Sequence, residues 1–171
     1  MIVYKSYSIN HIIFTLSILF YSLRLTINWI KGTNGFEYED WRYRHFRETS
    51  KNKFMWFIIN FFGIHLVPTL FVFLGMLPLF TIYSLPSLSI LSNIGSLIVV
   101  GGSILELISD RQMAKFRSTN KERKCCSIGL WKYCRHPNYL GEMLIWVGVF
   151  VTMILSDTSS WYYIIGMIMM I

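Results

Sequence analysis

Long apolar stretches separated by polar segments are the main pattern of this chain. No Asp, Glu, Lys or Arg occurs between Lys53 and Glu106, a run of 52 residues. About 20 apolar residues are enough for one helix to cross a bilayer, so this run has room for two spans. A soluble core does not need such a run, and the pattern therefore predicts a membrane protein.

The same pattern predicts about five helical spans. We expect them at residues 8–30, 54–83, 86–108, 137–155 and 161–171. The last of these would rise only about 16 Å, half of a hydrocarbon core, so the chain is expected to end inside a span. Pro68 and Pro78 predict a kink in the second span. The predicted fold class is an all-α, polytopic helical integral membrane protein with a single domain, residues 1–171.

Charged residues predict the orientation of these spans. Residues 31–53 hold six Lys or Arg and four acids, and residues 109–135 hold eight Lys or Arg and two acids. The connections near 84–89 and 156–160 hold no basic residue. By the positive-inside rule, the loops at about 31–53 and 109–136 are cytoplasmic. The expected location is the endoplasmic reticulum in a eukaryote or the inner membrane in a bacterium.

Composition narrows the classes of partner. The chain is 54% hydrophobic and 15% charged, with a formal net charge of +7. The basic residues flank the predicted spans, so topology and anionic lipid explain them and no nucleic-acid partner is expected. The three cysteines, Cys125, Cys126 and Cys134, contain no Cys-x-x-Cys pair, and no metal site is predicted.

The segment "GLWKYCRHPNYLGEMLIW" crosses from charged to apolar sequence. Pro137 suits the first turn of a helix, and free N–H groups at that end would attract an anion. Arg135 and His136 stand just before it, which indicates a site for a group such as a phosphate. The alternative is that these two side chains anchor the helix at the lipid headgroups.

Polar side chains with helical spacing occur on three of the predicted spans. The stripes are Tyr21, Arg24 and Asn28; Ser103, Glu106, Asp110 and Arg117; and Asn138, Glu142 and Trp146. A carboxylate within a span is costly if it faces lipid, so Glu142 should face protein or a water-filled cavity. A structural hydrogen-bond network could explain one stripe, whereas three indicate a cofactor pocket. We expect Asp110 and Glu142 to face each other across it.

Three segments carry a resemblance to a known family. "GLWKYCRHPNYLGEMLIWVGVF", "SDRQMAKFRS" and "RLTINWIKGTNGFEYEDWRY" resemble the steroid 5-alpha-reductase C-terminal-like family, in its uncharacterised, broadly distributed branch. The resemblance covers residues 16–162. It implies a multispan protein that binds NADPH from the cytoplasmic side and reduces a carbon–carbon double bond of a steroid or another lipid. That activity is an oxidoreductase acting on CH–CH groups, here active or vestigial.

The resemblance also implies a set of cofactor-binding residues. They are Asp110, Arg117, Lys124, Arg135, His136, Asn138, Tyr139 and Glu142. The three basic side chains among them would meet phosphates, and we expect NADPH to bind more tightly than NADH, with Arg135→Ala the most costly change. The catalytic residues stay unassigned, with Glu106 and Tyr21 as weak candidates. Relatives have further spans before this chain and a tail after it, so truncation at both ends is expected.

Two other function classes stay open. A methyltransferase that uses S-adenosylmethionine on a lipid or a prenylated cysteine also has an Arg-His-Pro motif at a span entrance. The Gly-Leu-Trp prefix and the Ser-Asp-x-Gln-x-x-x-Phe stretch favour the reductase. A non-catalytic membrane protein that retains the fold is favoured by the truncated ends.

Overall fold

Helices make up the structure throughout the part of the chain that is described. The computed structural model describes residues 7–32, 41–120 and 125–171, the first two residues of the middle range by backbone alone, and these contain no strand. Four helices are long and apolar enough to cross a membrane: Ile9–Gly32, Lys53–Ser84, Ile90–Thr119 and Pro137–Ile154. The predicted fold class, an all-α polytopic membrane protein, is confirmed.

The helices follow the chain in a simple order. The elements that make up the long helices are α1 (Ile9–Gly32), α3 (Lys53–Ile58), η1 (Ile59–Leu66), α4 (Val67–Ser84), α5 (Asn93–Thr119) and α6 (Pro137–Ile154). Of these, α3, η1 and α4 form one continuous helix. The short elements are α2 (Trp41–Thr49), η2 (Ile90–Ser92), η3 (Gly129–Lys132), η4 (Thr158–Tyr163) and α7 (Ile164–Met170).

Two predicted boundaries differ from the structure. The third predicted span ends at residue 108, but α5 continues to Thr119 because residues 109–119 are polar yet rich in good helix formers such as Arg, Gln, Met, Ala and Lys. The apolar part of the sequence ends near residue 108, but the helix α5 continues beyond it. The predicted fifth span, 161–171, is the 3-10 helix η4 followed by the seven-residue helix α7, and neither meets the length of a span.

Pro68 affects the helix just ahead of it. The eight residues of η1 form wider π-helical turns, and Pro68 lies in the first turn of α4. A proline ring inside a helix removes one backbone hydrogen bond and crowds the carbonyl four residues earlier, and a π-helical segment is one way to absorb that conflict. Pro78 is buried inside α4, which continues through it.

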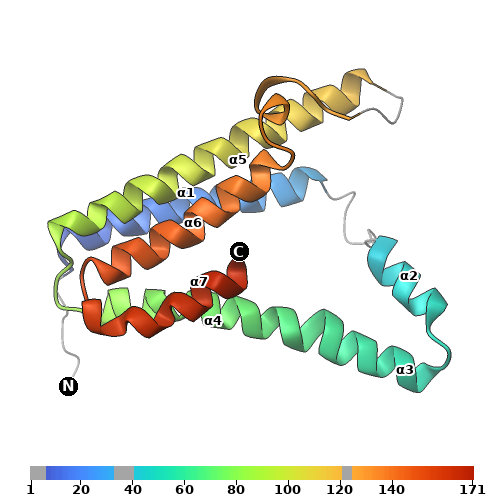
Figure 1. The fold of residues 1–171 in the computed structure, drawn as a ribbon, viewed down its shortest axis with the longest axis horizontal. Coiled ribbons are helices and arrows are strands. Elements are labelled where there is room, and N and C mark those ends of the chain that lie inside the picture. Colours follow the sequence, from blue (N-terminus) through green and yellow to red (C-terminus); the bar gives the residue numbers. More distant parts are fainter. Residues whose placement is uncertain (1–6, 33–40, 121–124) are drawn as a thin grey trace.

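The helices α1, α5 and α6 pack side by side into a bundle, and α7 packs along α4 (Figure 1). Glycines bring α5 and α6 close together. A Cβ on Gly102 would lie 2.6 Å from the Gly141 carbonyl oxygen, and a Cβ on Gly148 would lie 2.7 Å from that of Gly95. Small residues with this spacing allow backbones to approach closely in membranes.

The bundle has two ends with different chemistry. One end contains the starts of α1 and α5. There the buried His11 ring hydrogen-bonds with the Ile82 carbonyl, and Asn10 donates to the Leu88 carbonyl. The Ser89 N–H donates to Ser156 Oγ, so the two connections that lack basic residues lie together. We call the opposite end the basic end. It contains the C-terminal turns of α1 and α5 and the start of α6.

The glycine contacts between α5 and α6 give a direct test of this packing. Gly102→Ala should destabilise the protein by about 1–3 kcal/mol, because the new methyl group overlaps the backbone of Gly141. Gly101→Ala is the matched control, since a Cβ there meets nothing within 4 Å and alanine favours helix. Thermal unfolding in detergent would measure both. Equal stability of the two variants would contradict the close approach.

Candidate functional site

A buried ion network joins α1 to α5 at the basic end. Arg24 is only 6% exposed, and its Nη1 atom donates to Asp110 Oδ2 at 2.8 Å. Its Nη2 atom forms an ion pair with Glu106 Oε1, and Glu106 is 7% exposed. Asn28 adds a hydrogen bond from Nδ2 to Asp110 Oδ2 at 3.0 Å. One cation therefore holds two carboxylates within the bundle.

A second polar cluster joins α1 to α6. Glu142 Oε1 accepts a hydrogen bond of 2.6 Å from the Tyr21 hydroxyl and one of 2.9 Å from Trp146 Nε1. Glu142 faces protein, which satisfies the requirement for a carboxylate one turn into a span. The polar stripes of the three helices thus meet inside the bundle, and this part of the sequence prediction is confirmed.

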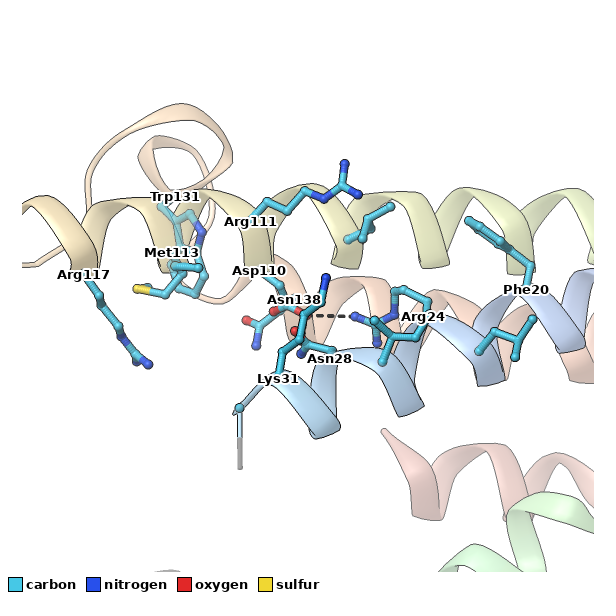
Figure 2. Close-up of a pocket in the computed structure, with 15 residues that line it drawn as sticks. Phe20, Arg24, Asn28, Lys31, Asp110, Arg111, Met113, Arg117, Trp131 and Asn138 are labelled. Carbon is cyan, nitrogen blue, oxygen red and sulfur yellow. Dashed lines mark hydrogen bonds and ion pairs between the residues drawn. The ribbon is translucent and has the colours of Figure 1, made fainter. Parts of the chain in front are cut away.

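A cavity of about 900 Å³ opens beside the first network, between α1, α5, η3 and the start of α6 (Figure 2). One part of its wall is polar and includes Asn28, Lys31, Asp110, Arg111, Arg117 and Asn138. Another part is apolar and includes Phe20, Leu23, Ile27, Leu107 and Met113. The cavity can therefore receive a molecule that has both charged and apolar parts.

The segment before α6 folds back onto α5 and forms part of the wall. Gly129 has a φ of +55°, a left-handed conformation that glycine adopts without strain, and a Cβ there would strike the Gln112 side chain. The Leu130 N–H donates to Gln112 Oε1 at 2.9 Å, and Trp131 Nε1 donates to the Ser109 carbonyl at 3.0 Å. These contacts place the Trp131 ring on the cavity wall.

Some buried polar atoms around the cavity have no hydrogen-bond partner within the described residues. They are Arg24 Nε, Glu106 Oε2 and Asn138 Oδ1, together with others elsewhere in the bundle. Buried acceptors are almost always paired in folded proteins. Asn138 lines the cavity, so a ligand with an N–H or O–H group could satisfy its carbonyl oxygen.

The electrostatics of the rim are positive. Lys31, Arg111 and Arg117 line the cavity with exposed side chains, and none of them forms a salt bridge within the described part of the chain. Arg24 pairs with both Glu106 and Asp110, so this network has at most one net negative charge against the three rim cations. Three cations on one rim are suited to an anionic ligand with more than one phosphate.

The structure separates the predicted site residues into groups. Asp110, Arg117 and Asn138 line the cavity. Glu142 lies one helical turn deeper, against Tyr21 and Trp146, and does not line it. The expectation that Asp110 and Glu142 face each other across one cavity is therefore wrong, because Tyr21 occupies the space beside Glu142.

The remaining predicted residues lie elsewhere. Arg135, His136 and Tyr139 are exposed and outside the cavity lining, and the rings of the last two stack with centroids 5.3 Å apart. Lys124 lies outside the described residues. Whether any of these side chains binds a cofactor stays a prediction.

The lining residues that sequence reasoning missed include Lys31, Arg111 and Trp131. Lys31 continues the helical stripe of Arg24 and Asn28, so the spacing could have revealed it. Arg111 was assigned to a loop because the predicted third span ended too early. Trp131 carries no signal of its own, because its position depends on the turn at Gly129.

Comparisons with known proteins give one family. Neither a curated protein nor a solved structure matched the chain. A family described as proteins of unknown function, DUF1295, matches residues 1–171. Since this match covers the whole chain, the protein belongs to the DUF1295 family.

Proposed function

We propose that the cavity binds NADPH and that the protein reduces a carbon–carbon double bond of a steroid or another lipid. The observation that carries this proposal is that three cations, none of them in a salt bridge among the described residues, line the rim of an amphipathic cavity in a membrane bundle. The DUF1295 family is also related to steroid 5-alpha-reductase-like proteins. Parts of the three motifs from which the sequence predicted this activity lie on α1, α5, η3 and α6, whose residues line the cavity.

The residues present fit a phosphorylated dinucleotide. Small-molecule sites have volumes of roughly 300–1,000 Å³, and this cavity is within that range. Lys31, Arg111 and Arg117 are available for phosphate oxygens. Asn138 Oδ1 is an acceptor to which no described residue donates, and a ribose hydroxyl or a carboxamide N–H₂ group could supply the donor. The chain has no Gly-x-Gly-x-x-Gly loop, so side-chain cations would replace the backbone cradle of a Rossmann fold.

The apolar wall supports a lipid as the second ligand. Phe20, Leu23 and Ile27 belong to α1, and Leu107 faces them from α5. Leu23 and Ile27 are about half exposed, so the apolar side of the cavity lies next to the surface that a bilayer covers. An apolar substrate could therefore reach the cavity without passing through water.

The bound cofactor would supply a hydride to one carbon of a polarised double bond, while a proton reaches the other carbon. The side chains of the protein bind and orient the reactants and exclude water. Arg24 keeps Asp110 on the cavity wall through the 2.8 Å hydrogen bond. The Tyr21 hydroxyl donates a hydrogen bond to Glu142 Oε1, which fixes α1 against α6.

Charge disfavours the methyltransferase alternative. S-adenosylmethionine has no phosphate and carries a sulfonium cation, whereas the rim presents three cations of its own. Like charges at short range repel one another, most strongly away from bulk water. The rim therefore favours a dinucleotide phosphate over S-adenosylmethionine.

Isotope transfer would test the proposed reaction. Purified protein in nanodiscs would receive NADPH with deuterium at C4 of the nicotinamide and a panel of α,β-unsaturated sterols and lipids. We expect one product to gain one deuterium and one solvent proton as NADPH is oxidised. The Arg111→Gln/Arg117→Gln variant is the control for site dependence. Transfer of a labelled methyl group from S-adenosylmethionine instead would show that the reductase assignment is wrong.

A further inference from the structure

We propose that the exposed residues at the start of α6 form a contact surface for anionic phospholipids, and that Arg135 and His136 serve this surface rather than the cavity. This headgroup surface consists of Lys132, Tyr133, Arg135, His136 and Tyr139. The proposal does not depend on the proposed function, because none of these side chains lines the cavity.

Position along the chain places this surface at headgroup depth. The apolar span of α6 begins at Pro137, and all five residues lie within five positions before it or in its first turn. Residues next to the start of a span lie where the hydrocarbon core gives way to the polar headgroups. The position of these residues in the chain therefore places this surface against the lipid headgroups of the bilayer.

Exposure and residue type agree with that partner. Tyr133 is 84% exposed and Tyr139 is 61% exposed, which are high fractions for large aromatic side chains. The Lys132 ammonium lies 5.8 Å from the centroid of the Tyr133 ring, and His136 stacks on Tyr139. Tyrosine is enriched at membrane interfaces because its ring is apolar and its hydroxyl is polar, and basic side chains extend toward the headgroups.

Charge complementarity selects anionic lipid in particular. Within the described residues, neither Lys132 nor Arg135 forms a salt bridge, and the headgroup surface contains no carboxylate. Each Lys or Arg close to an anionic membrane surface strengthens attachment by about fivefold. Two such cations favour a phospholipid with net negative charge over a zwitterionic one.

Competition between lipids tests the proposal. Purified protein would be incubated with equal amounts of phosphatidylglycerol and phosphatidylcholine, and native mass spectrometry would report which lipid it retains. Wild type should prefer phosphatidylglycerol, and Lys132→Gln/Arg135→Gln should lower this preference by roughly 25-fold. Lys115→Gln is the matched control, since Lys115 is an exposed cation that lines a different hollow beside α5. It should change the preference less than twofold.

One further variant and one further readout keep the outcome decisive. Arg135→Lys keeps the charge and should keep the preference, which separates loss of charge from misfolding. An unchanged preference in the double variant, or an equal loss in Lys115→Gln, would overturn the proposal. NADPH affinity of the double variant, where wild type binds NADPH, should stay within about threefold. A fall of tenfold or more would assign Arg135 to the cofactor site and would also overturn it.

Discussion

Replacing Arg24 with Met is expected to destabilise the protein by about 3–5 kcal/mol, because two carboxylates lose the cation that holds them. Among the contacts of the described residues, Asp110 would keep the Asn28 hydrogen bond, and Glu106 would lose its ion-pair partner. Removing one partner from a buried ion pair is far more costly than replacing the whole pair by neutral groups. The change should lower the melting temperature in detergent by about 10 °C.

A rescue variant separates this explanation from a simple loss of packing. The triple variant Arg24→Met/Glu106→Gln/Asp110→Asn has no uncompensated charge and should recover most of the lost stability. Asn28→Ala removes a single exposed hydrogen bond and should cost about 1 kcal/mol or less. A triple variant that is no more stable than Arg24→Met would contradict the electrostatic account.

Replacing Arg111 and Arg117 together by Gln is expected to weaken NADPH binding by at least about a hundredfold. A charge-assisted hydrogen bond to a phosphate contributes about 1.5–3 kcal/mol, which corresponds to tenfold or more for each arginine. Both side chains line the cavity, and glutamine keeps much of their length. Isothermal titration calorimetry in nanodiscs would measure the change.

Two comparisons make this measurement specific. Lys115→Gln removes a cation from the same helix but outside the cavity, and should leave NADPH affinity within about threefold. Arg135→Ala tests two opposed predictions for NADPH affinity. The sequence motif predicts the largest loss of affinity for this variant, whereas the cavity lining, which does not include Arg135, predicts a small loss. If Arg135→Ala weakens binding more than the double variant does, the cavity is not the main cofactor site.

Helical periodicity made the interior of the bundle predictable from the sequence. Tyr21, Arg24 and Asn28 follow one another at helical spacing, as do Glu106 and Asp110. An ionisable side chain within an apolar span is costly where it faces lipid, so it faces the interior of the bundle. Stripes of such side chains on neighbouring helices therefore face one another. The Arg24 network and the Tyr21–Glu142 hydrogen bond are direct consequences of that constraint.

The rim of the cavity was less predictable, because it depends on features that hydrophobicity does not report. The continuation of α5 beyond residue 108 places Arg111 on the cavity wall, and the left-handed Gly129 turns Trp131 toward α5. Motif position alone also does not show which way a side chain points. Arg135 and His136 lie within three positions of Asn138, which lines the cavity, yet both lie outside it.

The central claim is that the cavity between α1, α5 and α6 binds NADPH, and titration of the wild-type protein in nanodiscs tests it most directly. NADPH, NADH and S-adenosylmethionine would each be titrated by calorimetry under the same conditions. We predict saturable binding of NADPH, weaker binding of NADH because it lacks one phosphate, and no binding of S-adenosylmethionine. Saturable binding of S-adenosylmethionine, or the absence of any NADPH binding by folded protein, would contradict the account.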